Sequence, residues 1–269
     1  MTTLLLGKFP KILLATDGSE YITGAENEAI NFAKICSSKI CIMSVVLSNR
    51  EYDTLAPKLV KQAELDASDC MNMLQVKANA VGIESYTILR HSEYIYPEIV
   101  ATAREQNVNL IVVGRRGKKG LLKLLMGSRT TEVINHVHCS VLVVPRAAKI
   151  LGKNILLAID GSDYSKIATA VAAKIAKCFD APVTVISVVN KNETPKIIKV
   201  DDLLQGVKFN SHIVVGKYAE TIVETAKNIG SDLIIVGSHG HTGFKKILLG
   251  SVSEKVVSLA ECAVLVARN

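Results

Sequence analysis

Short apolar runs alternate with longer amphipathic stretches along the whole chain. The apolar runs are rich in Val, Ile and Leu, which is typical of strands buried on both faces of a parallel sheet. The stretches between them place apolar residues at helical spacing, so the alternation predicts an α/β fold with open parallel sheets. The predicted strands are 11–16, 39–46, 84–90, 109–113, 140–144, 154–159, 182–189, 207–214, 232–236 and 262–267. The predicted helices are 20–36, 55–81, 94–106, 128–137, 163–178, 201–205, 218–229 and 251–260.

The pattern of the first part of the chain returns in the second. The segment KILLATDGSE at 11–20 recurs as NILLAIDGSD at 154–163, an offset of 143. The segment 109–144 recurs at 232–267, an offset of only 123. The second copy therefore lacks 20 residues, and the gap falls where the first copy has the long helix predicted over 55–81.

We predict two tandem units, 1–147 and 148–269, joined by a short linker. Each unit is expected to be an open, five-stranded, Rossmann-like parallel sheet with helices on both faces. The second unit is shortened after its second strand, where a proline leaves room for only a short helix.

A glycine loop with the same spacing follows the fourth predicted strand of each copy. Ligands of open parallel sheets bind beyond the carboxyl ends of the strands, where glycine lets the backbone approach closely. A serine follows the last glycine where a helix begins, and it either caps the helix or donates to a phosphate. The spacing matches neither a Walker A motif nor the dinucleotide fingerprint. The loop residues are Gly114, Gly117, Gly127 and Ser128 in the first copy and Gly237, Gly240, Gly250 and Ser251 in the second.

An aspartate ends the first strand of each copy, in the sequence Asp-Gly-Ser. Beside phosphates a carboxylate is repelled, so Asp17 and Asp160 suit ribose hydroxyls or Mg²⁺ better. The alternative is a local role, as a helix N-cap or an Asx-turn with the following glycine.

With these motifs the chain resembles the universal stress protein family in its tandem form, and its second loop resembles the ATP-binding subgroup. The resemblance implies ATP or AMP binding, with Mg²⁺ as a companion of ATP, and an internal pseudo-dimer in which the final strands pair antiparallel. It places the base near Val45 or Val188 and the ribose near the aspartate and the first loop glycine. The phosphates would contact the later loop residues, including Arg129 in the first copy and Val252 in the second.

The two loops differ in chemistry. The first copy is strongly basic, reading GRRGKKG where the second reads GSHGHTG. Its arginines and lysines either attract phosphates or form a solvated face. The bulky Arg129 stands where the second copy has the smaller Val252, so we expect it to crowd the phosphates. We favour the second copy as the occupied site, with binding in both as the alternative. We interpret His239 as a phosphate or surface contact in preference to a catalytic base.

Charge and composition limit the partners and the cellular location that we expect. The net charge of +7 suits a polyanionic ligand, but no nucleic-acid recognition module is apparent, so no nucleic-acid partner is expected. No apolar run reaches the length of a membrane span, and the opening residues do not resemble a secretory signal, so we expect a cytoplasmic protein.

The leading hypothesis is a nucleotide-binding stress-response regulator that acts through its conformation or an unknown protein partner, as a homodimer. No catalytic residues are predicted, and at most slow ATP hydrolysis is expected. The alternatives are a nucleotide-free scaffold or dimerisation module and a slow ATP hydrolase.

Overall fold

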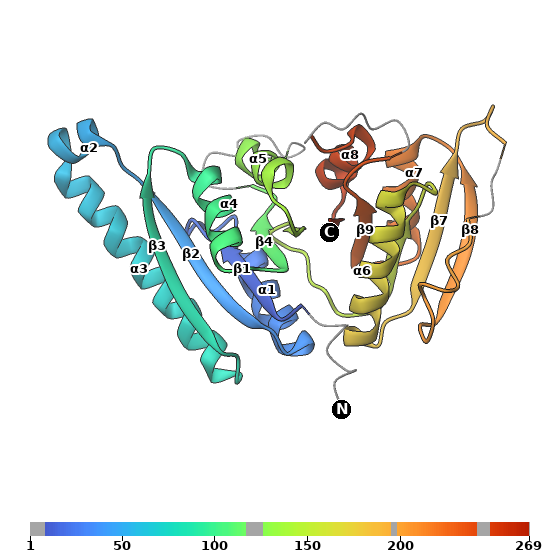
Figure 1. Cartoon of the computed structure of the whole chain (residues 1–269), viewed down its shortest axis with the longest axis horizontal. Helices are drawn as coiled ribbons and strands as arrows, with labels where there is room; N and C mark the ends of the chain where they lie inside the picture. The colour runs from blue at the N-terminus through green and yellow to red at the C-terminus, as the bar shows by residue number, and fades with distance from the viewer. Residues whose placement is uncertain (1–8, 117–125, 195–197, 241–247, 269) are drawn as a thin grey trace.

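The computed structural model describes residues 9–116, 126–194, 198–240 and 248–268. We call β1–β5 with their helices the first half and β6–β10 with theirs the second half (Figure 1). The first half contains β1 (Lys11–Ala15), α1 (Thr23–Cys36), β2 (Lys39–Leu47), α2 (Arg50–Leu55), α3 (Pro57–Ala80), β3 (Ser85–Ser92), α4 (Ile95–Glu105), β4 (Leu110–Gly114), α5 (Ser128–His136) and β5 (Ser140–Val144). The second half contains β6 (Ile155–Ala158), α6 (Asp163–Phe179), β7 (Val183–Val189), β8 (Phe209–Val215), α7 (Tyr218–Asn228), β9 (Leu233–Gly237), α8 (Ser251–Leu259) and β10 (Ala263–Ala267).

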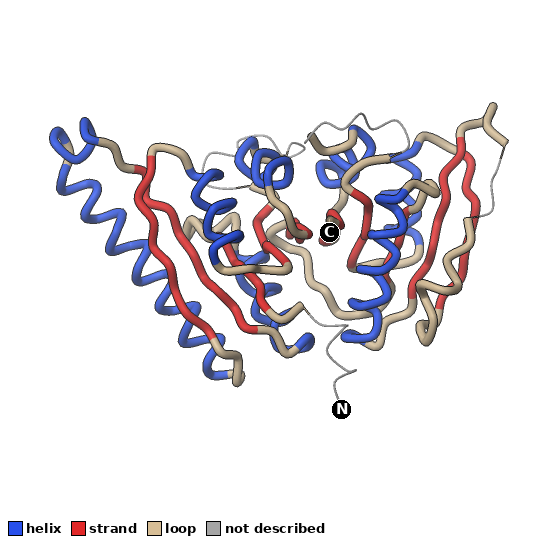
Figure 2. The backbone as a smooth tube through the Cα atoms, viewed as in Figure 1, coloured by secondary structure: helices blue, strands red, loops and turns tan. Residues whose placement is uncertain are grey.

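The described strands form one sheet in the order β3-β2-β1-β4-β5-β10-β9-β6-β7-β8. All neighbours are parallel except β5 and β10, which pair antiparallel with Leu142 opposite Leu265. The α/β architecture and the antiparallel pairing of the final strands are therefore confirmed. Figure 2 shows the strands running through the molecule with helices on either side, β3 beside α3 at one end and β8 at the other.

Alternating strand residues supply the two cores. Leu14 and Ile42 point to the face covered by α1, α3 and α6, whereas Leu13 and Met43 point to the face covered by α4, α5, α7 and α8. Because side chains alternate along a strand, burial on both faces requires the nearly continuous apolar runs seen in the sequence.

The helix predicted over 55–81 is confirmed as α3, which begins two residues later than predicted, whereas the short helix α2 before it was not predicted. The chain breaks at Ala56, whose backbone angles are φ −138° and ψ 49°, and α3 begins at Pro57. The proline ring disfavours helical angles for the residue before it, which separates α3 from the helix that precedes it. A separate short helix, α2, precedes the break.

The short helix predicted at 201–205 was wrong, because the structure has turns there. The stretch ends at Gly206, which has a positive φ of 76°. Its apolar side chains still cover the sheet in place of a long helix: Val200 and Leu204 are buried in the same core as α1, α3 and α6. The second half thus replaces α3 with a short irregular segment.

Across the described part of the chain, none of the helices has the length and apolar character needed to cross a membrane.

Candidate functional site

A cavity of about 660 Å³ opens at the carboxyl ends of the strands in the second half. Its walls come from the ends of β6, β7 and β9 and the starts of α6, α7 and α8. The sequence-predicted residues of this half all line it: Asp160, Val188, Gly237, His239, Gly240, Gly250, Ser251 and Val252.

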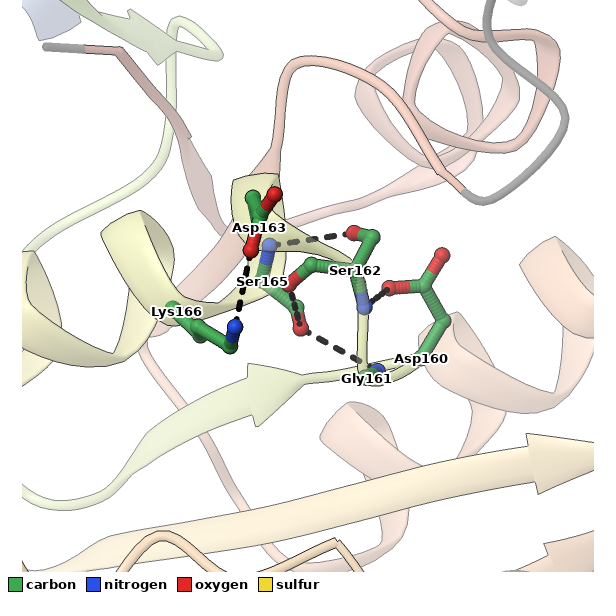
Figure 3. A network of polar contacts seen from close by, with 6 residues as sticks. All are labelled: Asp160, Gly161, Ser162, Asp163, Ser165 and Lys166. Carbon is green, nitrogen blue, oxygen red and sulfur yellow. Dashed lines mark hydrogen bonds and ion pairs between the residues drawn. The ribbon is translucent and has the colours of Figure 1, made fainter.

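Asp160 belongs to an Asx-turn that begins α6. Its Oδ1 accepts a hydrogen bond of 3.0 Å from Ser162 N, and Gly161 between them has a φ of 85° (Figure 3). The helix is capped by Ser162, whose Oγ accepts from Ser165 N at 3.2 Å. The N-cap alternative for the aspartate was therefore wrong and the Asx-turn is right. The turn holds the carboxylate at the cavity wall without excluding contact with a ligand.

The same carboxylate explains a glycine of the loop. A Cβ at Gly240 would lie 2.7 Å from Oδ2 of Asp160, closer than real Cβ contacts. Only glycine fits there without displacing the carboxylate. The end of β6 and the loop after β9 thus meet at the cavity.

The last loop glycine, Gly250, is the N-cap of α8, so Ser251 is the first helical residue and no side chain caps the helix. Gly250 N donates to Ser238 O at 2.8 Å, which closes the described ends of the loop on each other. The first bond of the helix runs from Glu254 N to Gly250 O at 2.9 Å. The N–H groups of residues 251–253 therefore precede the helical ladder, at cavity-lining positions. Such a terminus favours an anion.

Ser253 fixes this terminus to the sheet. Its Oγ donates to Gly237 O, the end of β9, at 2.7 Å. Thr130 makes the corresponding bond to Gly114 O in the first half, at 3.0 Å. The repeat therefore preserves the attachment of helix to strand in both halves.

His239 lies on the ring of Tyr164, with ring centroids 4.9 Å apart. Its Nδ1 is 3.1 Å from Ser238 Oγ. The imidazole is thus held by a tilted ring contact and by a neighbouring hydroxyl at the edge of the cavity.

Two lining residues, Glu193 and Tyr218, were not predicted from the sequence. Tyr218 OH donates to Glu193 Oε1 at 2.6 Å, and Asn190 N donates to Glu193 Oε2 at 2.9 Å. The hydrogen bond from Tyr218 is the main cause of a lowered pKa at Glu193, and the same bond raises the pKa of Tyr218. Glu193 lies in the segment that replaces α3, where the first copy offers no counterpart.

The first half has a much smaller cavity, about 90 Å³, at the equivalent place. Of its predicted residues, Asp17, Val45, Gly114 and Arg129 line this space, whereas Gly127 and Ser128 are not among its described lining residues. Gly117 lies outside the described residues.

At three positions that line the small cavity, the first half carries a bulkier residue than the equivalent position of the second half. Ile22 stands where the second half has Ser165, Arg116 where it has His239, and Arg129 where it has Val252; the first-half residue of each pair lines the small cavity. In each pair the first half has the longer or bulkier side chain. Arg129 is therefore one of three bulkier residues at the wall of this cavity.

No cluster of three His, Cys, Asp or Glu side chains within the described ranges is arranged to hold a metal ion. A cation at this site would need ligand atoms from a bound molecule.

The fold and site define a tandem α/β protein with a spacious cavity at the strand ends of one half and a filled one in the other. The chain belongs to the universal stress protein family, whose family model matches residues 8–145, 152–205 and 196–268.

Two relatives illustrate the extent of the match. A universal stress protein of Mycolicibacterium smegmatis is 28% identical over 249 residues, covering 84% of this chain and 80% of the relative. One of Synechocystis is 24% identical over 287 residues, covering 96% and 99%. The crystal structure of a universal stress protein from Archaeoglobus fulgidus DSM 4304 shares the fold, with a TM-score of 0.79, 22% identity and coverage of 97% of this chain and 98% of that one.

Proposed function

We propose that the second half of this chain binds one adenine nucleotide, ATP or AMP, and that occupancy controls the conformation or partner binding of a stress-response protein. The observation that carries the proposal is the difference between the two cavities. The second, at about 660 Å³, falls in the range usual for small-molecule sites, and the first, at about 90 Å³, falls below it.

The arrangement of groups in the second cavity supports a nucleotide in one orientation. The start of α8 offers backbone N–H groups and a positive helix end, which suit phosphates. Asp160 lies at the end of the neighbouring strand and suits ribose hydroxyls, which donate hydrogen bonds. Val188, at the end of β7, supplies an apolar part of the cavity wall that suits a flat base.

Mg²⁺ enters the proposal only as a companion of ATP. The described residues lack a metal-binding cluster, so phosphates and water molecules would provide most of its ligands, and Mg²⁺ commonly keeps several waters.

A homodimer is part of the same proposal, with one restriction from the fold. The final strands β5 and β10 already pair with each other inside the chain. An intermolecular contact therefore needs a surface other than these two strand edges.

Isothermal titration calorimetry with ATP and AMP tests the proposal. We expect one nucleotide per chain. Gly250→Val should abolish or strongly weaken binding, because even a Cβ there would lie 3.3 Å from His239 Cα and 3.4 Å from Ser238 O. Gly127→Val is the matched control at the equivalent N-cap, where the nearest atom would be 3.5 Å away, and it should leave binding unchanged. No heat with either nucleotide in the unchanged protein would favour the scaffold alternative and refute the proposal.

A further inference from the structure

The antiparallel pairing of β5 and β10 brings the end of α5, in the first half, against the loop that precedes α8, in the second. Asn135 lies in the last turn of α5 and is 8% exposed. Its Oδ1 accepts a hydrogen bond of 2.7 Å from Leu249 N, and Leu249 is equally buried. Leu249 directly precedes Gly250, the N-cap of α8 and a lining residue of the large cavity. A side chain of the first half thus contacts the phosphate end of the cavity in the second.

Asn135 is itself held in place from the second half. The guanidinium of Arg268, just beyond β10, donates to Val137 O at 2.9 Å and to Asn135 O at 3.4 Å. The backbone N–H of Arg268 donates to Ser140 Oγ at 3.1 Å. The carboxyl end of α5 is therefore fixed relative to β10, which leaves the amide of Asn135 little freedom to follow a moving loop.

The contact is not reciprocated across the pseudo-dimer. The repeat places Ser258 at the position of Asn135, and its Oγ donates to Glu254 O of its own helix at 3.0 Å. The first half instead reaches across with Arg115, which donates to Ala260 O at 2.5 Å and to Ser258 O at 3.4 Å. In the described residues, a side-chain amide from the other half therefore contacts the loop of the second cavity, and Ser258 makes no such contact to the loop of the first.

Resting on the nucleotide site proposed above, we propose that Asn135 is a positioning residue: it holds the phosphate-binding start of α8 in its binding geometry from the other half of the chain. The N–H of Leu249 is buried, so it needs an acceptor, and removal of that acceptor leaves an unsatisfied donor that can reach water only if the loop moves. Gly250 then moves with it, and the N–H groups that follow lose their alignment with the phosphates. The first half thereby has a role in nucleotide binding without holding a nucleotide.

The test compares ATP with adenosine, because adenosine has the base and ribose but none of the phosphates. Asn135→Leu replaces the amide with an apolar group of similar size. We expect ATP binding to weaken by about tenfold, which corresponds to one unsatisfied buried donor, and adenosine binding to change less than about twofold. Ser258→Val is the matched control at the repeat-equivalent position, and it should leave both affinities within about twofold. The thermal midpoint of each variant monitors folding.

Two outcomes would overturn the inference: unchanged ATP affinity in Asn135→Leu, or an equal loss of ATP and adenosine binding, which would indicate general disruption. The amide hydrogen exchange of Leu249 in the nucleotide-free protein separates this failure from that of the proposed function. If the unchanged protein binds no nucleotide, the proposed function fails, while faster exchange in Asn135→Leu still shows that Asn135 holds the loop. Unchanged exchange shows that it does not.

Discussion

The matched pair Asp160→Ala and Asp17→Ala separates a binding role from a local one. Both aspartates begin an Asx-turn: Ser162 N donates to Asp160 and Ser19 N donates to Asp17, each at 3.0 Å. Each alanine therefore removes the same backbone contact. The two sites differ in the cavity beside the carboxylate, which is large only at Asp160.

The expected magnitudes follow from these contacts. Loss of one turn hydrogen bond costs about 1 kcal/mol of unfolding free energy in either variant. Asp17 also accepts from Ser19 Oγ at 2.6 Å, so its substitution should destabilise at least as much. A hydrogen bond between a charged carboxylate and a ribose hydroxyl contributes about 1.5–3 kcal/mol, so Asp160→Ala should weaken ATP binding roughly 10- to 150-fold.

Calorimetric titration with ATP, together with urea unfolding of both variants, measures these effects. Asp17→Ala should retain the ATP affinity of the unchanged protein despite its loss of stability. Equal weakening by the two substitutions would refute the assignment of the site to the second half. Full ATP affinity in Asp160→Ala would show that this aspartate serves only the Asx-turn and does not bind the nucleotide.

Two further predictions concern stability. Gly24→Ala would normally stabilise a helix by up to about 1 kcal/mol, but its Cβ would lie 2.5 Å from the carbonyl oxygens of residues 145–146, and overpacking of this kind costs about 1–3 kcal/mol. We expect a lower thermal midpoint for Gly24→Ala. The control Asn27→Ala, on the exposed side of the same helix, should be neutral or slightly stabilising. A Gly24→Ala variant as stable as its parent would contradict the clash. Burial raises the pKa of Glu28, so the folded state favours the protonated carboxyl. The protonated carboxyl contributes its full stabilisation below the ordinary pKa of 4.5, and this stabilisation is lost as the pH rises through the raised pKa. The Glu28→Gln side chain cannot ionise and keeps an acceptor for Ile150 N. The urea midpoint of this variant should therefore rise relative to that of the parent between pH 4 and pH 7. A difference between the two midpoints that stays constant with pH would contradict the burial argument.

Much of the fold could be predicted because its signals are local. Strands buried on both faces must be continuously apolar, and a duplicated unit repeats its strand ends at fixed offsets. The residues of the second site could be placed for the same reason, since Asp160 and Gly250 directly follow strands or begin helices whose ends meet at one edge of the sheet. The proline at position 57 is the local signal that α3 begins there and not at residue 55.

The burial of individual side chains could not be predicted from the hydrophobic spacing alone. Leu59 and Leu65 fit the helical spacing of α3, yet they are 71% and 51% exposed, while Met71 and Leu74 are buried. Periodicity defines the face of a helix, but the extent of the sheet beneath it decides which turns of that face are covered.

The sequence by itself determined the duplicated α/β unit, the edge of the sheet that carries the motifs and the predicted residues that line the second cavity, because each depends on neighbours close along the chain. Only the tertiary structure decided that one cavity is open and the other filled, since Ile22 and Arg129 come from separate elements and meet only in the folded half. It alone brought Asn135 to Leu249, across 114 positions of the chain, because the pairing of β5 with β10 joins the two halves. Contacts of that separation depend on how whole elements pack, which no local pattern records.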